Sequence, residues 1–258
     1  MKKIVANGEI KQIVEERENN AETKFHFSSK LDEVIDGFIK ENKFLMLFSP
    51  PLEDLKKIER LILEHESEMW CIDFQIVAHL MDEVISSEMV AKYVEDNLEY
   101  YIEELTSNSM YKLHIALIKE AYEAYNLGFY KLCVFPLIST FDHVFSLWCE
   151  GKIQKKSISI EEKPNTRRLH ARVKPDEYEK VRQEYFTKIF TVSILRMYKK
   201  MFLKIPEQLP NELNRNAIMH GFYDYESITK EDVLKLFQLL KSAIVLTIAD
   251  SSQLLNNG

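Results

Sequence analysis

Apolar residues recur three and four positions apart along most of the chain, which is the spacing of an amphipathic α-helix. Two stretches leave the choice open: residues 1–27 contain either a hairpin around an Asn-Gly pair or a helical stripe, and residues 44–48 form either a buried strand or a helix end. The rest of the pattern predicts an all-α fold, with helices in the ranges 28–38, 55–65, 71–105, 113–126, 129–149, 175–204 and 229–246.

Local signals mark several helix boundaries. Gly128 suits the left-handed residue that ends a helix, and Pro136 kinks or restarts the helix that follows it. Thr229 and Asp232 have the spacing of a capping box, so the last long helix begins there.

The same pattern predicts how the chain is divided. Residues 71–105 fit one or two helices, and Pro175 begins a single long helix. The polar run 106–109 is the expected boundary between two regions. These are a mostly helical N-terminal region of unknown role, 1–107, and a helical bundle, 108–258.

Composition agrees with a globular protein. The 258 residues are 46% hydrophobic and include only six glycines and seven prolines. The chain has no uninterrupted apolar run of about 18 residues, and its start lacks the features of a signal peptide, so we expect a cytoplasmic protein without a membrane span. The three cysteines are widely spaced among apolar residues, which indicates reduced core thiols.

Charge is unevenly distributed. The net charge of -7 argues against a protein that binds nucleic acid by bulk electrostatics. Residues 151–174 are nevertheless basic, and this segment is either a solvated loop or a loop that follows RNA phosphates. Its basic residues are Lys152, Lys155, Lys156, Lys163, Arg167, Arg168, Arg172 and Lys174. In the second interpretation Lys155, Lys156, Arg167 and Arg168 bind RNA.

Most of the candidate chemistry lies between residues 213 and 221, where Arg215, Asn216 and His220 occur within six positions. In a helix, Asn216 and His220 share one face, and the longer Arg215 side chain reaches the same region. A guanidinium binds phosphate oxygens, an imidazole exchanges protons near neutral pH, and an amide orients a ring or a ribose hydroxyl. These three groups suit a phosphodiester substrate.

Asp142 is a second candidate because it interrupts an apolar helical stripe. A carboxylate there needs a cation or several hydrogen-bond donors. Arg215 or His220 is the expected partner, and the alternatives are another basic residue or a position at a domain seam. The neighbouring His143 is interpreted as a residue of the helix surface.

The Arg215-Asn216-(three residues)-His220-Gly221 motif resembles the Arg-(four to six)-His motif of the HEPN superfamily, whose active members are metal-independent endoribonucleases. The resemblance covers the motif and its helical setting, not the first hundred residues. Residues 60–65 have the same Arg-to-His spacing, but an ordinary amphipathic helix explains them.

The resemblance implies a HEPN-like helical domain that cleaves RNA by attack of a ribose 2'-hydroxyl on the adjacent phosphate. His220 would be the general acid or base, Arg215 would offset the phosphate charge, and Asn216 and Asp142 would complete the site. Tyr223 would either stack on a base or pack against the domain. No metal or other cofactor is expected, and the chain lacks the usual P-loop, serine-esterase and zinc motifs.

The resemblance also implies partners. HEPN nucleases pair two motifs across a two-fold axis, so we expect a homodimer, or a heterodimer if a partner chain supplies the second copy of the motif. An antitoxin or another regulatory protein is expected as a further partner in phage defence or a toxin-antitoxin system. The alternative is a non-catalytic helical module that binds a protein or a nucleotide.

Overall fold

The structure is a computed structural model that describes residues 52–80, 85–153, 158–181, 185–205 and 212–252. All of them belong to one compact unit, Ser49–Gly258. The helix expected at 28–38 and the two open stretches of the N-terminal region lie outside the described residues. Lys155 and Lys156 lie outside them as well.

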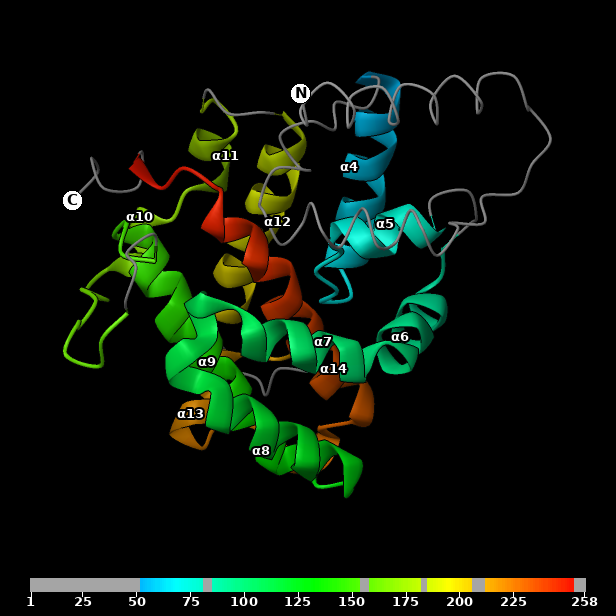
Figure 1. Cartoon of the computed structure of the whole chain (residues 1–258), viewed down its shortest axis with the longest axis vertical. Helices are drawn as coiled ribbons and strands as arrows, with labels where there is room; N and C mark the ends of the chain where they lie inside the picture. The colour runs from blue at the N-terminus through cyan, green and yellow to red at the C-terminus, as the bar shows by residue number, and fades with distance from the viewer. Residues whose placement is uncertain (1–51, 81–84, 154–157, 182–184, 206–211, 253–258) are drawn as a thin grey trace, which may run out of the picture. The chain divides into compact units, whose positions relative to one another are not determined.

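The expected all-α fold is confirmed, because the described residues form helices and no strand (Figure 1). The α-helices are α4 (Leu52–Glu66), α5 (Phe74–Leu80), α6 (Ser87–Asp96), α7 (Leu98–Ser107), α8 (Ile115–Asn126), α9 (Tyr130–Cys149), α10 (Leu169–Arg172), α11 (Pro175–Tyr178), α12 (Tyr185–Met201), α13 (Arg215–His220) and α14 (Lys230–Ser242). Three short 3-10 helices are also present: η1 (Ser109–His114), η2 (Tyr225–Ser227) and η3 (Ala243–Thr247).

Helix α9 lies at the centre of the core, packed against α8 and α14 (Figure 1). By length and composition it is apolar enough to cross a membrane, but 67% of its most apolar window is buried inside this fold. The Trp148 indole donates to the Ala249 carbonyl at 3.1 Å, which attaches the end of α9 to the chain after α14. Helix α9 is therefore packed as the core helix of a globular domain.

The predicted helix ends at Gly128 and Thr229 are confirmed. Gly128 adopts a φ of +77°, and the amide of Phe129 donates to the Ala124 carbonyl at 2.8 Å, so the end of α8 is closed by a Schellman turn. Thr229 and Asp232 form both hydrogen bonds of a capping box at the start of α14. Helix α9 continues through Pro136 and does not restart there.

Two predicted helices are divided differently from the prediction. Between 74 and 107 the described residues form three helices, where one or two were predicted. The single long helix predicted from Pro175 is wrong, because α11 ends at Tyr178 and α12 begins at Tyr185. The Tyr178 ring is buried against Trp148, and its hydroxyl donates to the Asp250 carbonyl at 2.7 Å, which holds α11 as a separate short element.

The expected boundary near residue 107 is a tight junction between packed helices. Asn108 caps the 3-10 helix η1 with its side chain, and α7 contacts both α8 and α14. The division of the chain at this point, and a separate role for residues 1–107, remain predictions.

All three cysteines are buried and free, as predicted. Burial raises the pKa of the Cys71 thiol to about 12 and that of Cys133 to about 11, so both are protonated at neutral pH. Neither is suited to nucleophilic chemistry.

Candidate functional site

Helix α13, which carries the Arg-His motif, is short and firmly anchored. The Asn214 side chain accepts from the Ala217 amide at 2.8 Å and caps the N-terminus. Ala217 and Ile218 are fully buried, so the middle of the helix faces the core. Gly221, with a φ of +80°, ends the helix, and the Phe222 amide closes the turn onto the Ala217 carbonyl at 2.9 Å.

The Arg215 guanidinium is held from three sides. Its Nη2 donates to Oδ2 of Asp142 at 2.9 Å, and its Nη1 donates to Oδ1 of Asn216 at 3.2 Å. The guanidinium also lies over the Phe202 ring, 5.5 Å from the ring centre. Two of its five N–H donors are used in these bonds, and 28% of the side chain is exposed. The Arg215 guanidinium is therefore held in one orientation and still has N–H groups that are not used in these bonds.

Asp142 therefore has the first of its two expected partners. Burial raises the pKa of this carboxyl, while the Arg215 charge and hydrogen bond act in the opposite direction and offset only part of the effect. The geometry gives Asp142 the role of a positioning residue for Arg215. A carboxylate already bonded to a guanidinium is not free to act as a base.

Asn216 differs from the prediction. Its amide nitrogen donates to the carbonyls of Phe202 and Leu203, at 3.2 and 2.8 Å, just after the end of α12. The side chain thus connects α13 to the end of α12 and supports the Arg215 guanidinium. The spacing of four residues predicts that Asn216 and His220 share one helix face. The Asn216 amide is instead held by the main-chain carbonyls at the end of α12.

The His220 side chain is exposed at the end of α13 and forms no hydrogen bond or ion pair with the described residues. The motif places Arg215 and His220 on one short helix, but no hydrogen bond joins them. Two apolar neighbours are also exposed, Met219 by 40% and Phe222 by 59%. A free imidazole and an apolar surface therefore occur together.

A column of stacked aromatic rings lies beneath the Arg215 guanidinium. Phe145 stacks on Tyr198, and Tyr198 stacks on Phe202, with 4.2 Å between ring centres in each pair. The His170 ring of α10 lies 6.4 Å from that of Tyr198. Because these rings are buried or rigidly packed, they fix the position of the guanidinium relative to α9 and α12.

The basic segment is partly neutralised by its own surroundings. Lys152 pairs with Glu150 at 2.5 Å, Lys174 pairs with Glu177 at 2.8 Å, and Arg172 donates to the Asn165 carbonyl at 2.8 Å. By contrast, the exposed side chains of Arg167 and Arg168 form no ion pair within the described residues. Of the four basic residues predicted to bind RNA, these are the two that the structure describes.

Tyr223 is not available to stack on a base. Its side chain is only 7% exposed, and its ring lies 6.2 Å from that of Tyr225. The alternative interpretation, packing against the domain, is therefore confirmed. The exposed aromatic residue of this segment is Phe222, one position earlier, and hydropathy alone does not distinguish these neighbouring rings.

The sequence interpretation missed a pair of histidines beside Asp142. His143 is half-buried, and its Nδ1 lies 2.8 Å from Nε2 of the buried His114. Burial lowers the pKa of both rings, to about 4 for His114. The interpretation of His143 as a plain surface residue is wrong, because its partner lies 29 positions away and no spacing rule relates the two.

The other segment with this spacing, 60–65, has the packing of an ordinary amphipathic helix: Arg60 is exposed and His65 is buried. No three acidic, histidine or cysteine side chains among the described residues are placed to hold a metal ion. Comparison of the chain with protein-family models, with curated proteins and with solved structures found no match.

Proposed function

We propose that this protein is a metal-independent endoribonuclease with a HEPN-like site. The observation that carries the proposal is the Arg215 guanidinium, fixed by Asp142 and Asn216 on the same short helix as His220, which is exposed and has no partner among the described residues. A preorganised cation and a free imidazole are two of the groups that transesterification of RNA uses.

The proposed reaction needs a general base, a general acid and a cation, all of which protein side chains can supply. The ribose 2'-hydroxyl loses its proton to a base and attacks the adjacent phosphorus, the bond to the 5'-oxygen breaks, and an acid protonates the departing oxygen. His220 is suited to one of these proton transfers, because an imidazole changes its charge near neutral pH. Arg215 offsets the negative charge of the pentavalent phosphate through its remaining N–H donors.

A second chain supplies the other proton carrier in this proposal. One His220 cannot serve as base and acid on opposite sides of the phosphate in the same step, so a homodimer with both motifs at its interface gives a complete site. The exposure of Met219 and Phe222 beside His220 supports this arrangement, because contact with a second chain would remove these apolar side chains from water.

Arg167 and Arg168 are proposed to contact the RNA backbone, because each has an exposed guanidinium without an ion-pair partner in the described part of the chain. A cytoplasmic location, a role in phage defence or a toxin-antitoxin system, and a regulatory partner belong to the same proposal. They rest on the family resemblance alone.

One observation favours the alternative, a non-catalytic module that binds a protein or a nucleotide. The Arg215 charge is already matched by Asp142, and the Asn216 amide is occupied by main-chain carbonyls. A guanidinium that is already paired and an amide that is already bonded are explained by a structural role, and they contribute less to the stabilisation of a phosphate charge.

The test is RNA cleavage by the purified protein in excess EDTA, comparing wild type with His220→Ala. We expect the wild type to cleave and the variant to lose activity at an unchanged melting temperature, because His220 is exposed and bonds to none of the residues that the structure describes. The products should carry a cyclic phosphate or a 3'-phosphate. Equal cleavage by both proteins would exclude His220 as a catalytic residue, and RNA binding without cleavage by either would favour the alternative.

A further inference from the structure

One face of α9 connects the Arg215 site with an aromatic ring that the proposed reaction does not use. Phe135, Ser139 and Asp142 are spaced four and three residues apart, so they lie on one face of the helix, with Phe135 about 10 Å along the axis from Asp142. All three are at least partly exposed, whereas most of α9 is buried in the core. The Arg215 guanidinium is bonded to the Asp142 end of this face.

The segment that follows the motif runs beside the same face of α9 in the opposite direction. It begins with Arg215 bonded to Asp142, and further along the Tyr225 ring stacks on the Phe135 ring, with ring centres 5.9 Å apart and planes 26° apart. Figure 1 shows α13 beside α9. His220 is halfway between the two contacts in the sequence. The guanidinium, the candidate proton carrier and the ring pair therefore occur along one side of α9.

The Phe135 ring is fixed in place and still accessible. The Tyr225 hydroxyl donates to the Ile218 carbonyl at 2.5 Å, and the Tyr225 ring also packs against the buried Tyr223. Tyr225 is therefore a rigid support for Phe135, which is nevertheless 37% exposed. An aromatic surface that is already held in this way loses little conformational entropy when a flat group stacks on it.

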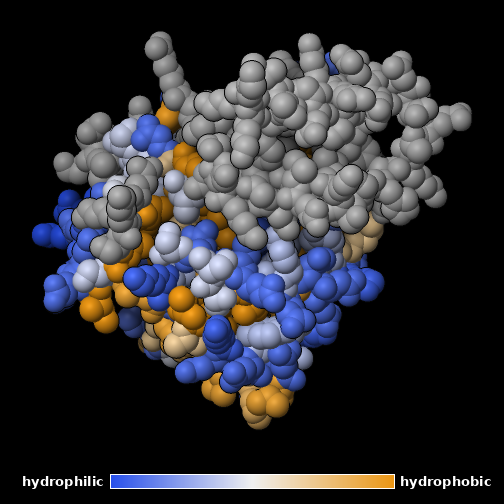
Figure 2. Space-filling model, in the orientation of Figure 1, coloured by the Kyte–Doolittle hydropathy of each residue, from blue (hydrophilic) through white to orange (hydrophobic). Residues whose placement is uncertain are grey.

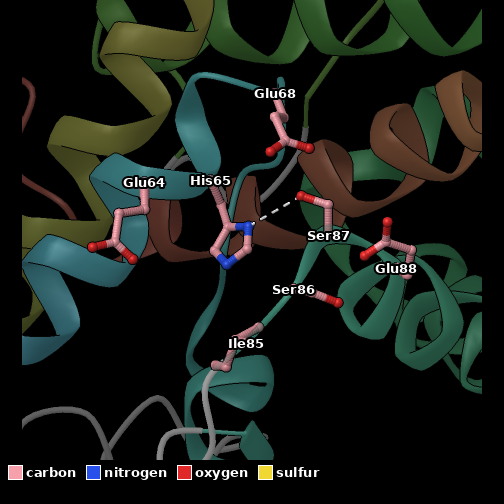
Figure 3. A pocket seen from close by; sticks show the side chains of 7 residues that line it. All are labelled: Glu64, His65, Glu68, Ile85, Ser86, Ser87 and Glu88. Atoms are coloured by element: carbon pink, nitrogen blue, oxygen red, sulfur yellow. Dashed lines mark hydrogen bonds between the residues drawn. The ribbon is translucent and has the colours of Figure 1, made fainter.

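A cavity elsewhere on the described surface is a poor alternative site for RNA. It has a volume of about 290 Å³ and lies where the end of α4 meets the start of α6 (Figure 3). The carboxylates of Glu64, Glu68 and Glu88 line it, and they would repel a phosphate backbone. The exposed face of α9 offers the Arg215 guanidinium and an aromatic ring instead.

We infer that Phe135 forms a stacking site for one unpaired base of an RNA whose phosphate is held at Arg215. The inference rests on the proposed nuclease function and adds a binding subsite to it. A base of any kind can stack on an aromatic ring, so this contact favours binding without selecting a sequence. The base must be unpaired, because in a duplex its faces are covered by the neighbouring bases.

The test is binding of a single-stranded RNA that cannot be cleaved because every 2'-hydroxyl is methylated, measured in excess EDTA. Its adenines are replaced by 2-aminopurine, whose fluorescence is quenched by stacking, so the signal reports the contact itself. Phe135→Leu keeps an apolar side chain and removes the ring, and Phe135→Tyr retains a ring. Phe129→Leu is the matched control, because that ring is 55% exposed in the turn between α8 and α9.

We expect wild type and Phe135→Tyr to bind and quench alike, and Phe129→Leu to match them. Phe135→Leu should bind about tenfold more weakly and quench less, because it lacks the stacking surface. The same RNA as a duplex should bind wild type more weakly than the single strand does. Equal binding and quenching by the two leucine variants, or duplex binding as tight as that of the single strand, would overturn the inference.

RNA cleavage separates this inference from the proposed function. If wild type and Phe135→Leu cleave ordinary single-stranded RNA with the same KM and kcat, the stacking site is wrong and the nuclease assignment stands. If quenching depends on Phe135 but wild type cleaves no RNA, the stacking site stands and the nuclease assignment is wrong.

Discussion

At the scale of single residues, the Asp142–Arg215 pair is the contact that most directly shapes the candidate site. Burial removes hydration from the Asp142 carboxylate, which destabilises its charged form. The guanidinium 2.9 Å away offsets only part of this cost, since the pKa of Asp142 remains raised. The pair is therefore better explained by the orientation it gives Arg215 than by a gain in stability.

Asp142→Asn should consequently change the free energy of unfolding by no more than about 1 kcal/mol at pH 7. Activity should fall, because an amide holds the guanidinium less firmly than a carboxylate. A raised carboxyl pKa means that the folded protein binds the proton more tightly than the unfolded chain. The stability of wild type relative to this variant should thus be highest below the ordinary aspartate pKa of about 4 and decline as the pH rises through the folded value.

Urea denaturation of both proteins between pH 4 and pH 7 measures this difference. A variant that is several kcal/mol less stable at pH 7, at the level of about 3 kcal/mol seen when one partner of a buried pair is removed, would show that the ion pair mainly stabilises the fold.

The His114–His143 pair should make the fold sensitive to acid. The pKa of both rings is lowered, so below pH 6.5 the unfolded chain binds protons that the folded protein excludes. The contribution of the two neutral rings to the free energy of unfolding should be fully present above pH 6.5. It should be lost as the pH falls toward about 4, the pKa of His114 in the folded protein.

His114→Gln removes the more deeply buried ring, so its unfolding free energy should fall less between pH 7 and pH 5 than that of wild type. His220→Gln is the control, because that ring is exposed and has no partner in the described part of the chain. If the three proteins have parallel stability curves over this range, the histidine pair does not control the response to acid.

At the scale of elements, the two glycine helix ends provide a matched comparison. Gly221 and Gly128 have φ values of +80° and +77°, and a Cβ at either position would meet no atom within 4 Å. Alanine should therefore cost about 1 kcal/mol of stability at both positions through backbone strain alone.

Only Gly221→Ala should also impair RNA cleavage, because it alters the backbone directly after His220, at the proposed seam between two chains. Denaturant midpoints and cleavage rates for both variants test this expectation. Equal cleavage rates in the two variants would mean that the backbone conformation at Gly221 does not contribute to the site.

The elements also show which features the sequence could predict. The turn at Gly128 and the capping box at Thr229 were predictable because each depends on residues within five positions. Asp142 was found because a charge in an apolar stripe requires a partner. The contacts of Asn216 with the end of α12, and of His143 with His114, were not predictable because they depend on which helix ends become neighbours.

Burial posed the same difficulty for individual positions. Leu113 and Leu117 fit the predicted apolar stripe of the helix at 113–126, yet each is 37% exposed, while Ile118 is fully buried. Neighbouring positions differ by about 100° around a helix, so a stripe read from sequence alone is uncertain by one residue.

At the scale of the whole molecule, exposed apolar side chains are spread over several elements. Figure 2 shows them scattered among hydrophilic residues. Some of them lie at the lower end of the view, where the α8–α9 turn lies. Leu127 and Phe129 in that turn are 70% and 55% exposed, and Leu132 on α9 is 64% exposed. Exposure alone does not identify an interface, so a test of assembly must compare apolar positions near the motif with others far from it in the sequence.

The proposed homodimer makes such a comparison possible. Light scattering at micromolar concentration should report about twice the 30.5 kDa chain mass for wild type. Met219→Glu combined with Phe222→Glu places two charges beside each His220 and should yield monomers without RNA cleavage. Ile160→Glu is the control, because that side chain is 82% exposed in the segment before α10 and should leave the dimer intact. A strictly monomeric wild type that cleaves RNA would contradict the shared site, since one chain would then provide both the acid and the base.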